Sequence, residues 1–184
     1  MIIGITGGIG SGKSTIANAL ARQGFAVYDC DREAKKIVTE NAEVRKAIVS
    51  LLGSEAFMNG LYNTSYVARR VFDEPAILAQ LNAIIHPAVK ADILSKKPDI
   101  IESAILYEAG MDALCDKVIV IDAPEEMRIA RTISRDYNGE ASVENISKIR
   151  ARIRAQRLHT GDLLLINDGK TSIDELASII THWL

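Results

Sequence analysis

Cysteine, surplus positive charge and long hydrophobic runs are all scarce in this chain of 184 residues. The two cysteines, Cys30 and Cys115, lie far apart and outside any metal-ligand spacing, which predicts free thiols in a reducing compartment. A formal net charge of -2 argues against broad adhesion to nucleic acid or to a membrane surface. We expect no apolar stretch long enough to span a bilayer and no targeting segment, because no basic region precedes the apolar residues at the start. The predicted location is therefore the cytoplasm.

Short apolar runs alternate with helical patterns along the chain, which is typical of a wound α/β fold. We predict a three-layer α/β/α sandwich around a parallel five-stranded sheet. The expected strands lie at residues 2–5, 25–28, 100–101, 118–121 and 163–166. Helices are expected at 13–23, 31–40, 43–52, 65–71, 76–96, 125–135 and 142–157, with a last helix after the candidate capping residue Ser172.

The chain is expected to form a single domain, residues 1–184, that carries two helical additions. Residues 34–96 are predicted to be almost wholly helical, and this is more chain than a simple crossover between two strands needs. We therefore interpret residues 34–96 as a substrate-binding insertion. Residues 128–157 form two helical patterns around a polar, turn-like segment and are predicted to be a lid.

A glycine-rich motif follows the first expected strand and opens the first expected helix. Residues 7–14 read Gly-Gly-Ile-Gly-Ser-Gly-Lys-Ser and fit the phosphate-loop pattern G-x-x-x-x-G-K-[ST] in the structural context that this pattern requires. The backbone N–H groups would cradle phosphate, Lys13 would reach the β and γ phosphates, and Ser14 would place its hydroxyl on Mg²⁺. The sequence predicts ATP binding by Gly8, Ile9, Gly10, Ser11, Gly12, Lys13, Ser14 and Thr15. A glycine turn that merely joins strand to helix is the weaker alternative. With this loop, the predicted sandwich is of the type found in P-loop nucleotide hydrolases.

Carboxylates at the ends of two expected strands are candidates for acid–base and metal chemistry. Asp29 and Asp31 follow the second strand, and their side chains would point the same way if the backbone stayed extended. Asp31 is the preferred base for a hydroxyl acceptor with Asp29 as its partner, although a carboxylate here could equally cap the next helix. Asp31, Glu102 and Glu108 are the alternatives for the acid that supports Mg²⁺, with plain surface exposure as the other interpretation of the two glutamates.

Two groups of arginines occupy the predicted lid. Arg128, Arg131 and Arg135 can share one helix face, as can Arg150, Arg154 and Arg157. Such guanidinium groups would stabilise the charge that moves during phosphoryl transfer, and we assign Arg131 and Arg135 with Lys13 and Asp31 to catalysis. The alternative is a solvated basic face that forms surface ion pairs with Glu125, Glu126 and Glu144.

The motifs together resemble the dephospho-coenzyme A kinase family across most of the chain. The resemblance rests on residues 6–15, on Asp29-Cys30-Asp31, on residues 69–72 and 81–87, and on residues 104–108, 120–125, 131 and 135–136. It implies transfer of the γ-phosphate of ATP, with Mg²⁺, to the ribose 3′-hydroxyl of dephospho-coenzyme A, the last step of coenzyme A synthesis. Asp31 then matches the base of the family.

The same resemblance implies that Asp29, Arg69, Arg70 and His86 bind the acceptor, although His86 could instead orient a helix break at Pro87. Two positions depart from the family pattern. Ala104 replaces the usual proline, and residues 162–167 are more apolar than the usual acidic segment, so the resemblance does not predict the contacts to the nucleotide base there. The expected partners are the two small substrates, with neither nucleic acid nor membrane, and a monomer or small homo-oligomer. The rival functions are another small-molecule kinase with the same loop and a nucleotide-dependent switch.

Overall fold

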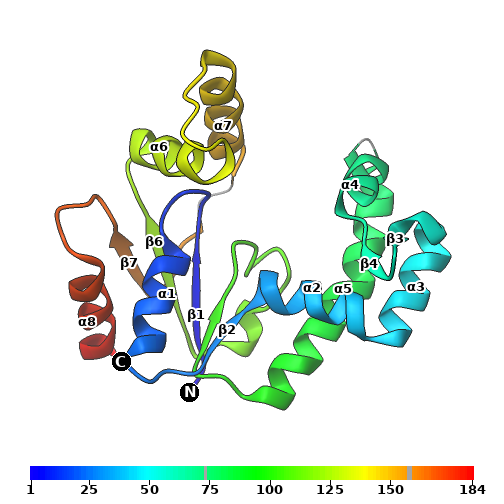
Figure 1. Ribbon diagram of the computed structural model, residues 1–184. Coiled ribbons are helices and arrows are strands. Elements are labelled where there is room, and N and C mark those ends of the chain that lie inside the picture. The colour runs from blue at the N-terminus through cyan, green and yellow to red at the C-terminus, as the bar shows by residue number, and fades with distance from the viewer. Residues whose placement is uncertain (73, 157–158) are drawn as a thin grey trace. The chain divides into compact units, whose positions relative to one another are not determined.

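A parallel sheet of five strands lies at the centre of the compact unit that contains residues 1–28 and 98–184 (Figure 1). The computed structural model describes residues 1–72, 74–156 and 159–184. The strands are β1 (Ile3–Gly7), β2 (Val27–Asp29), β5 (Ile100–Glu102), β6 (Lys117–Asp122) and β7 (Leu163–Ile166), in the order β2-β5-β1-β6-β7. β1 pairs in parallel with both β5 and β6, so the phosphate loop emerges from the centre of the sheet. The predicted α/β fold with a five-stranded parallel sheet and flanking helices is confirmed.

Helices α1 (Lys13–Arg22) and α8 (Ile173–Trp183) cover one face of this sheet. Their apolar side chains join those of the strands in one core, which includes Ile5, Leu20, Ile119 and Ile180. The predicted capping box is present, since Ser172 Oγ accepts from Glu175 N–H while the Glu175 carboxylate accepts from Ser172 N–H. Ile179 of α8 is exposed, whereas Leu176, Ala177 and Ile180 of the same helix are buried.

Helices α6 (Glu125–Asp136) and α7 (Val143–Ala155) stand beyond the carboxyl ends of the strands (Figure 1). A polar turn joins them, as expected, with Asn138 and Gly139 both at positive φ. Their apolar faces enclose a small core of Ile129, Ile133, Ile149 and Ile153, and Ile9 of the phosphate loop packs against it. α7 ends before the predicted limit of residue 157, and Arg157 lies outside the described residues.

Residues Asp29–Lys97 form a second compact unit, and residues 1–28 and 98–184 form the first. The second unit contains α2 (Cys30–Glu40), α3 (Ala42–Leu52), the 3₁₀ turn η1 (Ser54–Ala56), α4 (Thr64–Phe72) and α5 (Pro75–Lys96). Its own core includes Val38, Ile48, Val67 and Leu81. The four helices match the expected patterns closely.

This segment also contains a short hairpin, which the expectation of an almost wholly helical segment did not include. β3 (Phe57–Met58) and β4 (Leu61–Tyr62) pair antiparallel across Asn59 and Gly60, which both have positive φ. Asn-Gly is the residue pair that such a two-residue turn favours, so the sequence carried the signal. The rings of Phe57 and Tyr62 pack in a T-shaped, edge-to-face arrangement across the two strands, with their centroids 5.7 Å apart.

α5 runs unbroken through Pro87, as the predicted helix over residues 76–96 requires, so the alternative that His86 orients a helix break at this residue is wrong. The proline removes one backbone N–H, and packing of Leu81, Val89 and Ile93 in the interior maintains the helix on both sides. α5 is also long and apolar enough, by length and composition alone, to cross a membrane. Our expectation that no stretch approaches that length is therefore wrong, although a helix that packs in a protein core passes the same test.

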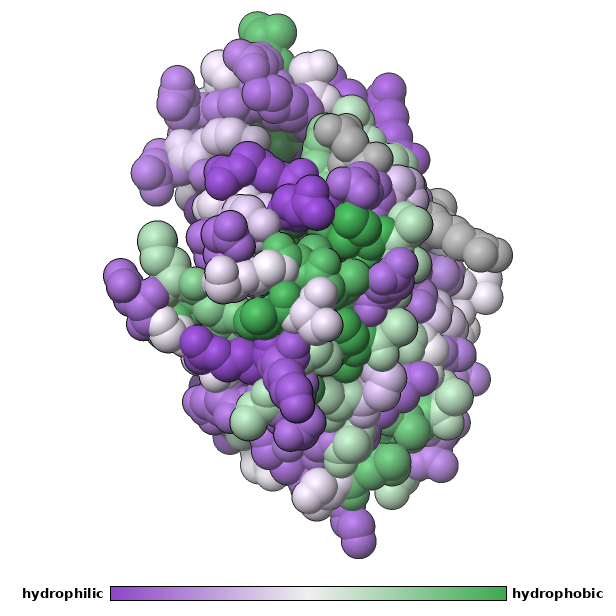
Figure 2. Space-filling model, turned by 90° about the vertical axis from the view of Figure 1, so that its right-hand side faces the viewer, coloured by the Kyte–Doolittle hydropathy of each residue, from purple (hydrophilic) through white to green (hydrophobic). Residues whose placement is uncertain are grey.

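Hydrophobic side chains also reach the surface. On the face in Figure 2 they gather near the middle, with hydrophilic side chains around them. The exposed large hydrophobic residues include Met58, Leu61, Phe72, Ile105 and Leu164. Ile105 and Leu164 line a cleft that also includes Gly8 of the phosphate loop and that is described below.

Candidate active site

The phosphate loop joins β1 to α1 over residues 8–12, as the sequence predicts. The Ser11 N–H donates to the Gly8 carbonyl, and the Ile16 N–H donates to the Gly12 carbonyl as α1 begins. The amino end of a helix carries partial positive charge and unpaired N–H groups, so this turn is suited to bind an anion. Ser14 and Thr15 are exposed in the first turn of α1.

Glu102, at the end of β5, lies beside the first residues of α1, which follow this loop. Ser14 Oγ donates to Glu102 Oε1 at 3.2 Å, and Lys13 Nζ lies 3.7 Å from the same oxygen. Both Lys13 and Glu102 are largely buried, which strengthens their attraction. A hydroxyl and a carboxylate are the hard oxygen donors that Mg²⁺ prefers, so these side chains fit a magnesium ion carried by phosphate. The described residues contain no cluster of three or more His, Cys, Asp or Glu side chains that could hold a metal by themselves.

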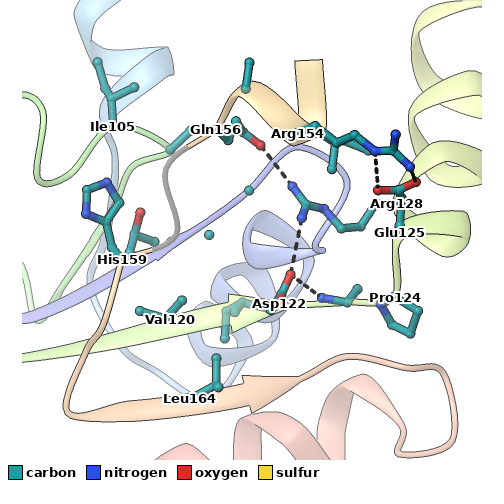
Figure 3. Close-up of a pocket in the computed structure, with 18 of the residues that line it drawn as sticks. Ile105, Val120, Asp122, Pro124, Glu125, Arg128, Arg154, Gln156, His159 and Leu164 are labelled. Atoms are coloured by element: carbon teal, nitrogen blue, oxygen red, sulfur yellow. Dashed lines mark hydrogen bonds and ion pairs between the residues drawn. The ribbon is translucent and has the colours of Figure 1, made fainter. Parts of the chain in front are cut away.

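Arg128 and Gln156 hold the outer side of the loop. Arg128 is buried, and its Nε donates to the Ile9 carbonyl at 2.8 Å while Nη2 donates to Gln156 Oε1 at 2.9 Å. The same Gln156 oxygen accepts from the Ile9 N–H at 2.8 Å. A longer contact of 3.4 Å joins Arg128 Nη1 to Asp122 at the end of β6 (Figure 3). Both backbone groups of Ile9 are thus tied to α6 and to the residue after α7.

Arg131 lies one helical turn further along α6 and contacts the other half of the loop. Its Nη1 is 3.4 Å from the Gly10 carbonyl oxygen and 3.3 Å from that of Ser11. Its Nη2 donates to the carbonyl and the side-chain oxygen of Asn167, and the Asn167 amide in turn donates to the Ser11 carbonyl. The guanidinium of Arg131 and the amide of Asn167 thus brace the loop from two elements.

Arg135, Arg150 and Arg154, the other arginines predicted to act in the lid, form ion pairs with carboxylates. Arg135 pairs with its neighbour Asp136, whose pKa falls because of this hydrogen-bonded pair. Arg150 and Arg154 both pair with Glu125, and Arg150 also pairs with Glu126. Hydrogen bonds from Arg154, and then from Arg150, lower the pKa of Glu125. For Arg150 and Arg154 the structure therefore shows the surface ion pairs of the alternative, while Glu144 pairs with Lys148 instead.

Asp29 and Asp31 do not share an extended backbone, so the condition under which both side chains would point the same way is not met. Asp29 is the N-cap of α2, and its carboxylate accepts from the Arg32 N–H at 3.0 Å. Asp31 lies in the first turn of that helix with an exposed side chain. Since Asp29 supplies the cap, the Asp31 carboxylate is left for another role, and its assignment as the base stays a prediction.

The predicted acceptor residues of the second unit lie on two helices. Arg69 and Arg70 are exposed in the last turn of α4, and Arg70 pairs with Glu74 at 3.5 Å. His86 is half-buried in α5, and burial, followed by the charge of Lys90, lowers its pKa. Their contact with an acceptor also stays a prediction.

Sequence reasoning missed Gln156 as a loop contact and did not assign Asn167 a role. Asn167 could have been found, because it directly follows a parallel strand at the edge where such sheets bind ligands. Gln156 carries no such signal.

Comparison with known proteins now identifies the family. A family model described as dephospho-CoA kinase matches residues 1–173. The chain belongs to the dephospho-CoA kinase family. It is 39% identical to a dephospho-CoA kinase of Bacteroides fragilis, with 97% of this chain and 90% of that protein covered. Against that of Porphyromonas gingivalis the identity is 43%, with 73% and 69% covered.

A solved structure from Thermus thermophilus, TT1252, supports the same fold. The TM-score is 0.80 at 29% sequence identity, and the match covers 100% of this chain and 97% of the other. The order of strands and the position of the loop described above are therefore those of a P-loop kinase of this family.

Proposed function

We propose that this chain catalyses transfer of the γ-phosphate of ATP to the ribose 3′-hydroxyl of dephospho-coenzyme A, which gives coenzyme A and ADP. The observation that carries the proposal is the group formed by Lys13 and Ser14 at the start of α1 and Glu102 at the end of β5, in a chain that matches the family over residues 1–173. This reaction is the final step of coenzyme A synthesis.

Catalysis rests on positioning and on electrostatic stabilisation of the phosphoryl group. The loop amides and the Lys13 ammonium would bind the β and γ phosphates. Ser14 and Glu102 would hold Mg²⁺, which neutralises phosphate charge when bound. Glu102 is preferred to Glu108 as the acid that supports Mg²⁺ because Glu102 contacts Ser14, whereas Glu108 is hydrogen-bonded to His159.

The acceptor oxygen forms a bond to the γ-phosphorus while the bond from that phosphorus to the bridging oxygen breaks, and ADP leaves. Asp31 would accept the proton of the attacking hydroxyl. Arg131 is near enough to the loop to stabilise the moving charge, whereas Arg135 would first have to leave Asp136. Asp29, Arg69, Arg70 and His86 would bind the acceptor, with residues 34–96 as the substrate-binding insertion and 128–157 as the lid. We further propose a cytoplasmic enzyme.

A panel of acceptors tests this function. The full chain, ATP and Mg²⁺ would be incubated with dephospho-coenzyme A, adenosine monophosphate, thymidine monophosphate or shikimate, and release of ADP followed. We expect dephospho-coenzyme A to be preferred by orders of magnitude, with the new phosphate on the 3′-oxygen by mass spectrometry and NMR. Preference for another acceptor would replace this function, and ADP release that needs no acceptor would indicate a nucleotide switch.

A further inference from the structure

A cleft of about 890 Å³ begins at Gly7, the last residue of β1, and at Gly8, the first residue of the phosphate loop (Figure 3). It continues over Val120 of β6 and Leu164 of β7, which are register partners in the sheet. Their sequence neighbours Ile119, Ile121 and Leu165 belong to the core with α1 and α8. Because side chains alternate along a strand, Val120 and Leu164 lie on the opposite face. The volume is in the range of small-molecule sites.

The two ends of the cleft differ in chemistry. At the loop end, Arg128 and Arg154 lie beside Asp122 and Glu125, and each of these carboxylates pairs with an arginine. At the far end His159 and Ile105 line the cleft, and His159 Nε2 lies 2.8 Å from Glu108 Oε1. Two arginines therefore line the loop end of the cleft, and a mixed apolar and hydrogen-bonding region lies beyond them.

Large apolar side chains are left exposed in this hollow. Leu164 is 59% exposed although it lies within a strand, and Ile105 is 44% exposed. Apolar surface in a concave site is favourable only when something covers it. The two departures from the family pattern also meet here, because both Ala104 and Leu164 line the cleft.

The direction of the loop indicates which substrate the cleft meets. The β and γ phosphates are expected at Lys13 and the α phosphate at Thr15, so the base of ATP extends from the Thr15 end. Gly7 and Gly8 line the cleft, whereas residues 10–15 do not. The cleft therefore opens on the γ-phosphate side, where the acceptor arrives.

We propose that this cleft holds the pantetheine arm of dephospho-coenzyme A, an inference that rests on the proposed function. The arm combines methyl and methylene groups with two amides and a terminal thiol. Its aliphatic groups would cover Val120, Leu164 and Ile105. Its amides need hydrogen-bond partners when they leave water, and Gln156, His159 and Glu108, which also line the cleft, carry donors and acceptors.

Steady-state kinetics of the full chain test the inference. The variants are Leu164→Ser and Ile105→Ser, and the matched control is Ile179→Ser, a 45% exposed isoleucine on α8 outside the cleft. We expect the KM for dephospho-coenzyme A to rise roughly tenfold in each cleft variant, while kcat and the KM for ATP stay within twofold of the wild type. 4′-Phosphopantetheine should inhibit the wild type competitively against dephospho-coenzyme A, and roughly tenfold more should be needed for either cleft variant.

Several results would overturn the proposal. An unchanged KM for dephospho-coenzyme A in both cleft variants would show that the arm lies elsewhere. A raised KM for ATP would assign the cleft to the nucleotide base, and an equal effect of Ile179→Ser would show general damage. A wild type that does not phosphorylate dephospho-coenzyme A would remove the proposed function and this inference together, whereas an active wild type with unaffected variants removes this inference alone.

Discussion

At the scale of single residues, Lys13 is the largely buried cation that joins the phosphate loop to the end of β5. We predict that Lys13→Ala lowers kcat/KM for ATP at least roughly 100-fold, because a preorganised charge at the transferred phosphate is lost. The melting temperature should fall by only a few degrees, since one contact of 3.7 Å to Glu102 disappears. Lys148→Ala, which removes only a surface pair with Glu144, is the control. Retained turnover in Lys13→Ala would remove the loop from the mechanism.

Arg131 contacts the loop through several hydrogen bonds from its planar guanidinium group, so the shape of this group is as important as its charge. We predict that Arg131→Ala lowers kcat roughly 100-fold with little change in the KM for the acceptor. Arg131→Lys should restore little, because an ammonium cannot reach the carbonyls of Gly10, Ser11 and Asn167 together. Arg152→Ala, on an exposed part of α7, is the control. Recovery of kcat in the lysine variant would mean that charge alone suffices.

At the scale of elements, the loop is packed too closely against α6 to accept a side chain in its middle. A Cβ at Gly10 would lie 2.4 Å from the Arg128 carbonyl oxygen, and the residue has φ of 73°. Gly24 has φ of 102° but no atom within 4 Å of a Cβ. We predict that Gly10→Ala costs about 2 kcal/mol or more of stability and weakens ATP binding, whereas Gly24→Ala costs about 1 kcal/mol. Urea unfolding and nucleotide titration measure both, and equal losses in the two variants would contradict the packing argument.

The regular elements could be predicted because their signals are local. Apolar spacing and end residues located the five strands of the parallel sheet and the eight α-helices of the described residues, and Ser172 and Glu175 identified the cap of α8. Alternatives stayed open where tertiary packing decides between local rules. A helix break at Pro87 was one of them, but residues on both sides pack in one core and the helix continues. An extended backbone at Asp29 and Asp31 was another, but Asp29 caps a helix that begins at the next residue.

The site could be predicted only in part for a related reason. Lys13 and Ser14 lie in a contiguous motif, so their positions follow from the sequence. Their partner Glu102 is 88 positions from Ser14, and Gln156 is 147 positions from Ile9. Such contacts depend on which strands become neighbours, and β5 beside β1 is not evident from spacing along the chain.

At the scale of the whole molecule, the chain divides into two units with separate cores. Charge contributes to the second unit through Glu33 of α2, a buried carboxylate held by Lys96 at the end of α5 and by Lys36 of its own helix, each at 2.8 Å. Arg32 adds a contact of 3.2 Å, and Lys96 also pairs with Asp92. Hydrogen bonds from Lys36 and then Lys96 lower the pKa of Glu33 from 4.5 to about 2.

This pKa shift predicts how the stability of the second unit depends on pH. A carboxyl group whose pKa is lower in the folded state binds a proton more readily when unfolded, so its contribution is complete above pH 4.5 and disappears as the pH falls to about 2. We expect about 1 kcal/mol, because the lysines are half-exposed and solvent screens the pairs. Urea unfolding of wild type and Glu33→Gln from pH 7 to pH 2 should show a difference that shrinks over this window, with exposed Glu40→Gln as the control. A difference that stays constant with pH would show that Glu33 stabilises α2 and α5 by packing and not by charge.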